Sequence, residues 1–68
     1  MLSAMRRIRL ERGLTQWEVA KALDVSRGMV SYWEHGHYTP SQEQLRKLAE
    51  VYGVEVGELL DNKQEVKR

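Results

Sequence analysis

Cysteine is absent from this chain of 68 residues, so the chain can form neither a disulfide nor a zinc site built on thiolates. Long apolar runs are also missing, because no stretch approaches the roughly 20 residues that a membrane-spanning helix needs. Arginines interrupt residues 1–12, which therefore lack the pattern of a secretory signal peptide. These absences are typical of a protein of the reducing cytoplasm, and we expect that location and no membrane partner.

The chain also has little excess of either charge. The net charge is +1, and a marked positive surplus occurs only in residues 1–12, where four arginines stand against Glu11. A nucleic-acid-binding protein usually carries a clear basic patch, so composition alone does not predict one.

The side-chain sets that catalysis would require are not found in the sequence. There is no nucleophile beside a base and no glycine-rich phosphate loop. His35 and His37 are close in sequence, but too few other ligands lie near them for a metal site. We therefore expect no enzymatic activity, no metal and no cofactor.

Apolar residues recur at helical spacing along most of the chain, without strand-like alternation. The sequence therefore predicts one all-α domain over residues 1–60 and a polar tail over residues 61–68. Five helices are expected. The first carries Met1, Met5 and Ile8 and ends at Gly13. The fifth is a short helix built on four apolar residues, Val54, Val56, Leu59 and Leu60.

The three middle helices are marked by side chains that cap helix starts, namely Thr15, Ser26 and Ser41. Glu18 and Gln44 follow two of these residues at the spacing of a capping box. These signals predict helices over residues 16–23, from 27 to about 35, and between 41 and 53.

The helix predicted from residue 27 to about 35, the third of the five, has two contrasting sides. At about 100° per residue, Val30 and Trp33 fall together and point to the core. Arg27, Gly28, Ser31 and Tyr32 lie on the other side, which lacks the long acidic and lysine side chains of a typical solvated face. This composition suits a surface that enters a groove, but chance on a short helix explains it equally well.

The second and third helices, joined by a turn of three to four residues, form a helix-turn-helix. With "GLTQ" at 13–16, "VA" at 19–20, "VS" at 25–26, "WE" at 33–34 and "PS" at 40–41, the sequence resembles the XRE family, the phage repressor and Cro type of DNA-binding domain, over residues 5–60. The resemblance implies a five-helix, lambda-repressor-like domain whose third helix enters the DNA major groove. The sequence departs from the family at Asp24, where glycine is common.

The resemblance implies two sets of DNA contacts. Bases would be contacted by Arg27, Gly28, Ser31 and Tyr32. Phosphates would be contacted by Thr15, Gln16, Ser26, His37, Tyr38 and Thr39. For Arg27 a guanine contact and a phosphate contact remain open, and Arg6, Arg7 and Lys21 are further phosphate neighbours or merely solvated residues. The resemblance also implies a structural ion pair between Arg9 and Glu34.

One recognition helix reads few bases, so the resemblance further implies a homodimer on a palindromic operator, with half-sites about 34 Å apart. We expect a transcriptional repressor. The alternative is an antitoxin-type or protein-interaction module that binds a partner protein. The sequence decides neither the dimer surface nor the role of Trp17.

Overall fold

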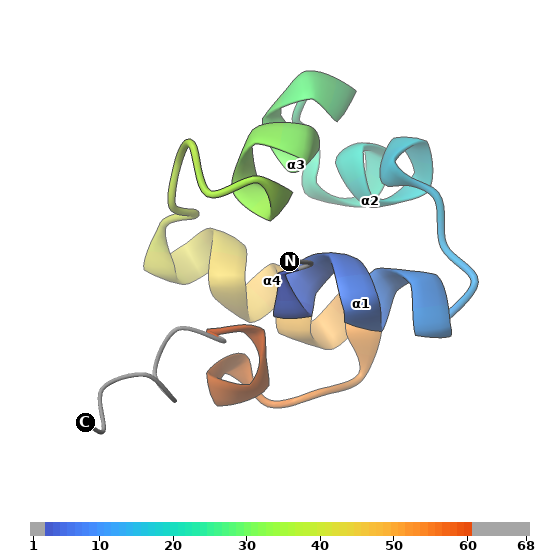
Figure 1. Cartoon of the computed structure of the whole chain (residues 1–68), viewed down its shortest axis with the longest axis vertical. Helices are drawn as coiled ribbons and strands as arrows, with labels where there is room; N and C mark the ends of the chain where they lie inside the picture. The colour runs from blue at the N-terminus through green and yellow to red at the C-terminus, as the bar shows by residue number, and fades with distance from the viewer. Residues whose placement is uncertain (1–2, 61–68) are drawn as a thin grey trace.

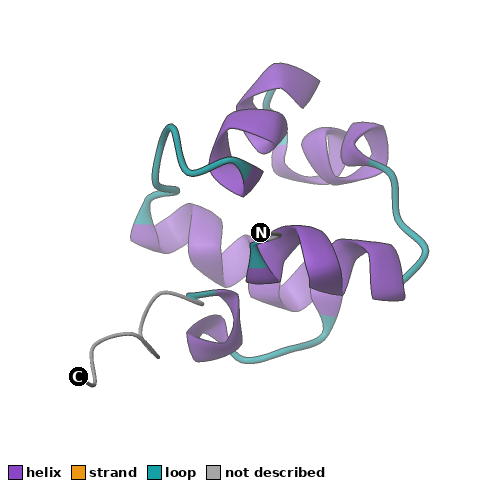
Figure 2. Cartoon of the chain, in the orientation of Figure 1, coloured by secondary structure: helices purple, strands orange, loops and turns teal. Residues whose placement is uncertain are grey.

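The computed structural model describes residues 3–60. Met1, Leu2 and the predicted tail over residues 61–68 lie outside the described residues. The described part of the chain is helical and contains no strand (Figure 2), which confirms the all-α prediction. Its elements are α1 (Ala4–Glu11), α2 (Gln16–Leu23), α3 (Arg27–Glu34), α4 (Gln42–Tyr52) and the 3-10 turn η1 (Val56–Leu59).

The elements form a small bundle with two distinct ends. In Figure 1, α2 and α3 lie together at one end, α1 and α4 cross the middle, and η1 lies at the other end. α2 packs against both α3 and α4, whereas α1 packs against α3 and η1. The helix-turn-helix unit formed by α2 and α3 therefore packs on α1 and α4.

The predicted helix starts in the middle of the chain are confirmed. Thr15, Ser26 and Ser41 each accept a hydrogen bond from a backbone N–H in the first turn of the helix that follows. The capping boxes are complete, because the Glu18 and Gln44 side chains accept from the backbone N–H of Thr15 and Ser41, each at 2.8 Å. Cap chemistry is local, which is why the sequence located these boundaries well.

The first helix starts at a cap that the sequence analysis did not identify. Ser3 is its N-cap and accepts from the backbone N–H of Arg6 at 3.1 Å. The apolar spacing that begins at Met1 runs through this cap, so periodicity alone did not reveal it.

The prediction of five helices is wrong: the described chain has four α-helices. The segment expected to be the fifth forms only the 3-10 turn η1, of 4 residues. It contains Gly57, which is a poor helix former, and 3-10 hydrogen bonding is typical of such short pieces. Leu59 is nevertheless buried, and Val56 and Leu60 pack against the core, so the segment closes the bundle as expected.

The core draws on every element. Its buried members include Ile8 of α1, Val19 of α2, Trp33 of α3, Leu48 of α4 and Leu59 of η1. None of the helices formed by residues 3–60 is both long and apolar enough to cross a membrane.

Candidate nucleic-acid interface

The turn between α2 and α3 occupies residues 24–26. Asp24 adopts the left-handed conformation, with φ 60° and ψ 46°, which a short polar side chain tolerates better than most. The backbone N–H of Val25 then donates to the carbonyl of Ala20 at 3.0 Å, and Ser26 caps α3. Aspartate thus serves where the XRE family commonly has glycine, and α2 and α3 form a helix-turn-helix.

The two sides of α3 are as the helical spacing predicts. Val30 is 1% exposed and Trp33 is 3% exposed, whereas Tyr32 is 47% exposed. Arg27 and Gly28 are exposed as well, and Ser31 is half-buried. All four residues proposed to contact bases therefore reach the surface of the same short helix.

Gly28 is not required by the packing of the protein. A methyl group added to it would meet only the Ser26 side-chain oxygen, at an ordinary contact distance of 3.8 Å. Glycine inside a helix costs up to about 1 kcal/mol relative to alanine, and nothing in the described fold offsets this. The bare backbone at Gly28 is therefore a property of the exposed surface rather than of the core.

A buried ion pair holds the end of α3 against α1. The Arg9 guanidinium donates to both carboxylate oxygens of Glu34, with Nε–Oε2 at 2.6 Å and Nη2–Oε1 at 3.2 Å. It also donates through Nη1 to the Leu14 carbonyl at 2.8 Å. The hydrogen bond to Glu34 raises the pKa of Arg9 above its usual value, although burial opposes this. These are the two residues that the resemblance pairs, and both are 6% exposed.

Gln16 connects this ion pair to the exposed side of α3. Its amide nitrogen Nε2 donates to Glu34 Oε1 at 3.0 Å. Its amide oxygen Oε1 accepts from Arg27 Nη1 at 3.3 Å. The first residue of α2 therefore bridges the two ends of α3.

A shallow hollow of about 480 Å³ lies beside the exposed side of α3. Its lining residues include two arginines and a histidine but no carboxylate: Arg6, Arg9, Leu10, Leu14, Thr15, Gln16, Ser31 and His35. Arg9 is already paired, so Arg6 and His35 supply the remaining basic groups. The lining residues thus carry no acidic side chain, in contrast to the mixed charge of the chain as a whole.

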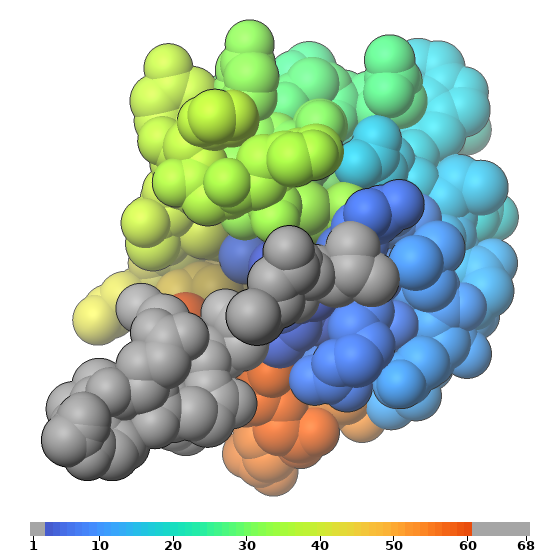
Figure 3. Space-filling view, viewed as in Figure 1, coloured from blue at the N-terminus to red at the C-terminus, as the bar shows by residue number. Residues whose placement is uncertain are grey.

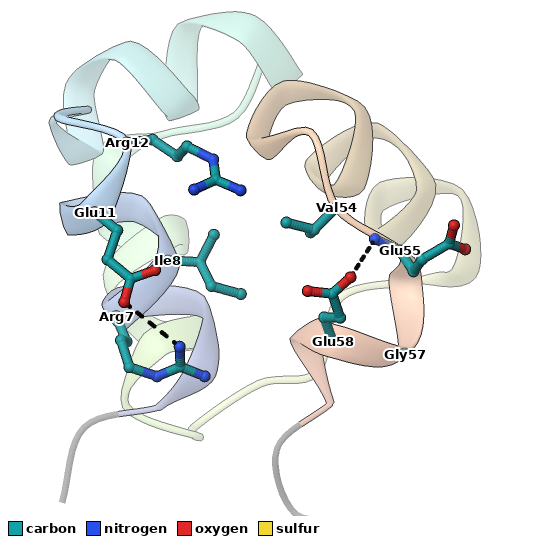
Figure 4. Close-up of a pocket in the computed structure, with 8 residues that line it drawn as sticks. All are labelled: Arg7, Ile8, Glu11, Arg12, Val54, Glu55, Gly57 and Glu58. Carbon is teal, nitrogen blue, oxygen red and sulfur yellow. Dashed lines mark hydrogen bonds and ion pairs between the residues drawn. The ribbon is translucent and has the colours of Figure 1, made fainter.

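A second hollow, of about 500 Å³, lies between α1 and η1 (Figure 4). Arg7 and Arg12 line it together with three glutamates, Glu11, Glu55 and Glu58. Arg7 forms an exposed ion pair with Glu11 at 3.7 Å. The two neighbouring arginines of α1 are thus separated: Arg6 lies beside α3, and Arg7 lies in surroundings of mixed charge.

The loop after α3 forms an aromatic cluster with it. The Tyr32 ring meets the rings of His37 and Tyr38 edge-on, with centroids 5.7 and 5.3 Å apart. His35 Nδ1 lies 2.8 Å from the Ser31 carbonyl, which accepts a hydrogen bond from it in the tautomer that carries its proton on Nδ1. Figure 3 shows α3 in green and this loop in yellow-green as one continuous surface, at the end of the molecule opposite η1.

The remaining predicted phosphate contacts lie near this surface or at its edges. Thr15 lines the hollow and donates its hydroxyl to Glu18 at 3.2 Å. Ser26 accepts from the Met29 N–H at 3.1 Å. Thr39 is exposed on the loop that follows α3. Trp17 is 70% exposed, and its side chain is not part of the hydrophobic core. Within residues 3–60 no group of three or more histidine, aspartate or glutamate side chains is placed to hold a metal.

A helix-turn-helix family model matches residues 5–59. The chain belongs to this helix-turn-helix family. The match confirms the resemblance to XRE-type domains, and it covers α2, α3 and the turn between them, together with the caps of α2, α3 and α4.

Curated relatives of the helix-turn-helix domain are transcriptional regulators. The cryptic phage CTXphi transcriptional repressor RstR of Vibrio cholerae is 38% identical over 60 residues, which are 88% of this chain and 54% of the relative. The HTH-type transcriptional regulator DdrOP3 of Deinococcus deserti is 40% identical over 57 residues, which are 84% of this chain and 44% of the relative. The HTH-type transcriptional activator BcrR of Enterococcus faecalis is 33% identical over 60 residues, which are 88% of this chain and 29% of the relative.

The chain spans about half the length of the first two relatives and less than a third of the last. No solved structure matches the chain significantly. The relatives therefore establish a shared helix-turn-helix domain, in proteins of which it forms only a part.

Proposed function

We propose that the protein is a sequence-specific, double-stranded DNA-binding transcriptional regulator that inserts α3 into the major groove and acts in the cytoplasm. The observation that carries this proposal is the exposed side of α3, with Arg27, Gly28 and Tyr32 on its surface and a carboxylate-free hollow beside it. An α-helix fits the major groove, where each base pair offers a distinct pattern of donors and acceptors. The hollow, which is lined by Arg6 and by no carboxylate, suits the phosphates at the edge of that groove.

The two contact sets have different tasks in this proposal. Arg27, Gly28, Ser31 and Tyr32 face base edges, and Arg27 can donate two hydrogen bonds to guanine O6 and N7. Six residues around them face phosphates: Thr15, Gln16, Ser26, His37, Tyr38 and Thr39. For Gln16 the backbone N–H suits this role, since it lies in the first turn of α2, where N–H groups have no partner within the helix.

We further propose a homodimer on a palindromic operator. Helix α3 has 8 residues and is therefore about 12 Å long. At about 3.4 Å per base pair, it spans only some three or four base pairs. Two copies related by a two-fold axis double the number of base pairs read, at half-sites about one helical turn apart. Tyr52, in the last turn of α4, is buried in the core at 2% exposure, so a pairing surface has to be formed by other residues.

Repression is the proposed outcome of binding, because a protein seated on an operator within a promoter blocks access to it. RstR is named a repressor, which supports this proposal, whereas BcrR is named an activator. A reporter gene behind the selected operator separates the two: repression lowers expression when the protein is present, and a rise contradicts it.

The decisive experiment selects bound duplexes from a random pool. We expect a two-fold symmetric sequence to be enriched, and its affinity to fall with salt concentration because each neutralised phosphate contributes about −0.9 to the slope of log K against log salt. An enriched sequence without symmetry contradicts the dimer. Failure to retain any duplex at low salt contradicts DNA binding altogether.

A protein-interaction module is the second candidate, and Trp17 favours it. An indole that is 70% exposed on α2 offers the kind of aromatic contact that protein interfaces use. A Trp17→Ala variant distinguishes the candidates. If it binds the selected operator as the wild type does but loses a protein that co-purifies with the wild type, Trp17 belongs to a protein interface.

A further inference from the structure

The exposed ring of Tyr32 is in contact with the loop that follows α3. It lies edge-on to the His37 ring, with centroids 5.7 Å apart, and to the Tyr38 ring, with centroids 5.3 Å apart. The interplanar angles are 83° and 81°, the T-shaped geometry that aromatic pairs favour. Two loop side chains therefore contact the side chain of a residue that is proposed to contact bases.

The loop is itself fixed to the end of α3 by backbone hydrogen bonds. The His37 N–H donates to the Tyr32 carbonyl at 2.9 Å, and the Gly36 N–H donates to the Trp33 carbonyl at 3.2 Å. Gly36 has a φ of 80°, a conformation that suits glycine, and this combination is the Schellman motif that ends many helices. The backbone therefore places His37, and Tyr38 after it, beside Tyr32.

The ring contacts limit how the Tyr32 side chain can move. Long side chains in a helix use two main χ1 rotamers, and a change of rotamer would break both contacts with the loop. Tyr32 is 47% exposed, so the rest of its surface is covered by the protein, and the two loop rings are part of that cover. Because the ring is placed before DNA arrives, ordering it on binding costs less entropy.

The chemistry of the aromatic cluster points to one kind of group on DNA. Arg27 and Ser31 present polar groups and Gly28 has no side chain, so Tyr32 supplies the aromatic surface among the four residues proposed to contact bases. Base edges in the major groove offer hydrogen-bond donors and acceptors, and thymine adds the apolar methyl group on C5. In 5-methylcytosine the methyl group is at the same ring position. An aromatic ring held on the groove-facing side of α3 therefore fits a pyrimidine C5 methyl group.

We propose that the aromatic cluster of Tyr32, His37 and Tyr38 is a binding site for the C5 methyl group of a pyrimidine. Tyr32 touches the methyl group, and the two loop residues position Tyr32. This inference rests on the proposed function, and it gives His37 and Tyr38 a role beyond phosphate contact. Its consequence is that changes in the loop alter the preference at the base pair that Tyr32 reads.

The test removes single methyl groups from the operator that is selected from the random pool. Deoxyuridine in place of a thymidine deletes the methyl group and keeps every hydrogen-bonding group of the base. Dissociation constants are measured by fluorescence anisotropy, with each thymine of one half-site replaced in turn. For the wild type we expect one thymine whose replacement weakens binding about fourfold, the effect of burying one apolar carbon.

Variants of the cluster assign this methyl effect. Tyr32→Ala is expected to abolish it, whereas Tyr38→Ala and His37→Ala are expected to lower it, because Tyr32 keeps its ring but loses a neighbour. All three positions are exposed, so we expect the variants to fold, and circular dichroism checks that they do.

Tyr38→Phe is the matched control, because it keeps the ring and removes only the hydroxyl. It is expected to weaken every duplex by the same factor, since the hydroxyl is the group proposed to contact phosphate, and to keep the full methyl effect. In the double variant Tyr32→Ala/Tyr38→Ala the methyl effect is absent, as in Tyr32→Ala alone.

A second set of duplexes distinguishes the two sources of the methyl group. The sensitive T·A pair is replaced by C·G, with and without a methyl group on cytosine C5. If the wild type binds the methylated duplex more tightly and Tyr32→Ala binds both alike, the site accepts methylated cytosine as well as thymine. A methyl effect at thymine alone supports the site with thymine as its ligand.

Three results overturn the inference while leaving the proposed function intact. The first is a selected operator in which no thymine methyl group affects binding, or in which the effect survives Tyr32→Ala. The second is a methyl effect that His37→Ala and Tyr38→Ala leave unchanged, since the loop rings then do not position Tyr32. The third is an equal loss in Tyr38→Phe and Tyr38→Ala. By contrast, a wild-type protein that prefers no duplex overturns the proposed function itself.

Discussion

Tyr32 and Trp33 are neighbours in the chain and lie on opposite sides of α3, with exposures of 47% and 3%. The helix turns by about 100° per residue, so the same short segment contributes to the core and to the surface at once. The stability of α3 and its recognition of a partner are therefore carried by different side chains, and single substitutions can separate them.

The first prediction compares these two aromatic residues. Trp33→Ala is expected to lower the free energy of unfolding by about 3–5 kcal/mol, because it leaves a cavity in the core. Tyr32→Ala is expected to change it by less than about 1 kcal/mol, because it removes only exposed ring contacts, while it weakens operator binding. Urea unfolding followed by circular dichroism measures the first quantity and fluorescence anisotropy of a labelled operator the second. Equal destabilisation by both changes contradicts the assignment of the two sides.

Gly28→Ala is predicted to stabilise the protein and weaken DNA binding. A methyl group fits at Gly28 in the free protein, and alanine is better than glycine in a helix by up to about 1 kcal/mol. If a DNA backbone or base edge approaches this position closely, the same methyl group clashes with it. Thermal unfolding and operator affinity are measured on the same preparation. A variant that is more stable and binds with unchanged affinity shows that Gly28 makes no close approach.

The Arg9–Glu34 pair is predicted to be costly to break and much less costly to replace. Glu34→Ala leaves a buried guanidinium without its carboxylate, and we expect a loss of about 3–5 kcal/mol. The double change Arg9→Met/Glu34→Leu removes both charges and is expected to cost less than Glu34→Ala alone.

The exposed pair Arg7–Glu11, whose side chains are 56% and 55% exposed, provides the control for that prediction. Arg7→Ala should cost less than about 1 kcal/mol, as surface ion pairs do. The comparison is made by urea unfolding at one pH. If the double variant at Arg9 and Glu34 is less stable than the single variant, packing rather than charge burial governs this site.

Tyr52 is predicted to make stability depend on alkaline pH. Burial, and then the nearby Glu34 charge, raise the pKa of Tyr52 from 10.0 to about 12. In the unfolded chain the phenol ionises near the lower value, so its neutral form stabilises the fold fully below pH 10. That contribution is lost as the pH rises from 10 to about 12.

Tyr52→Phe should remove this component. Urea midpoints are measured between pH 8 and 12 for both proteins, and the wild type should fall more steeply above pH 10. All other residues are common to both proteins, so their contributions cancel in the comparison. Parallel curves contradict the prediction.

The sequence predicted what local chemistry controls. Thr15, Ser26 and Ser41 marked their helix starts because a cap needs only its own first turn, and Val30 and Trp33 marked the buried side of α3 because helical spacing fixes it. The apolar residues after Gly53 predicted burial correctly but not the type of helix, since a segment this short can be closed by either hydrogen-bonding pattern.

The sequence could not predict contacts that depend on how helices cross. Gln16 meets Glu34 and Arg27 across 18 and 11 positions of the chain, and no spacing rule specifies such a bridge. The separation of Arg6 from Arg7 likewise follows from where α1 lies between α3 and η1. Two signals pointed toward the bridge: the resemblance, which implies the Arg9–Glu34 pair, and the Thr15 cap, which places Gln16 at the start of α2.

The contrast between Trp17 and Trp33, 70% and 3% exposed, has a practical consequence. The protein carries two tryptophan fluorophores in different environments. Iodide added to the folded protein should quench Trp17 emission and spare Trp33, whose emission should shift to longer wavelengths only when the chain unfolds. One unlabelled sample can therefore report separately on events at the surface of α2 and on the integrity of the interior.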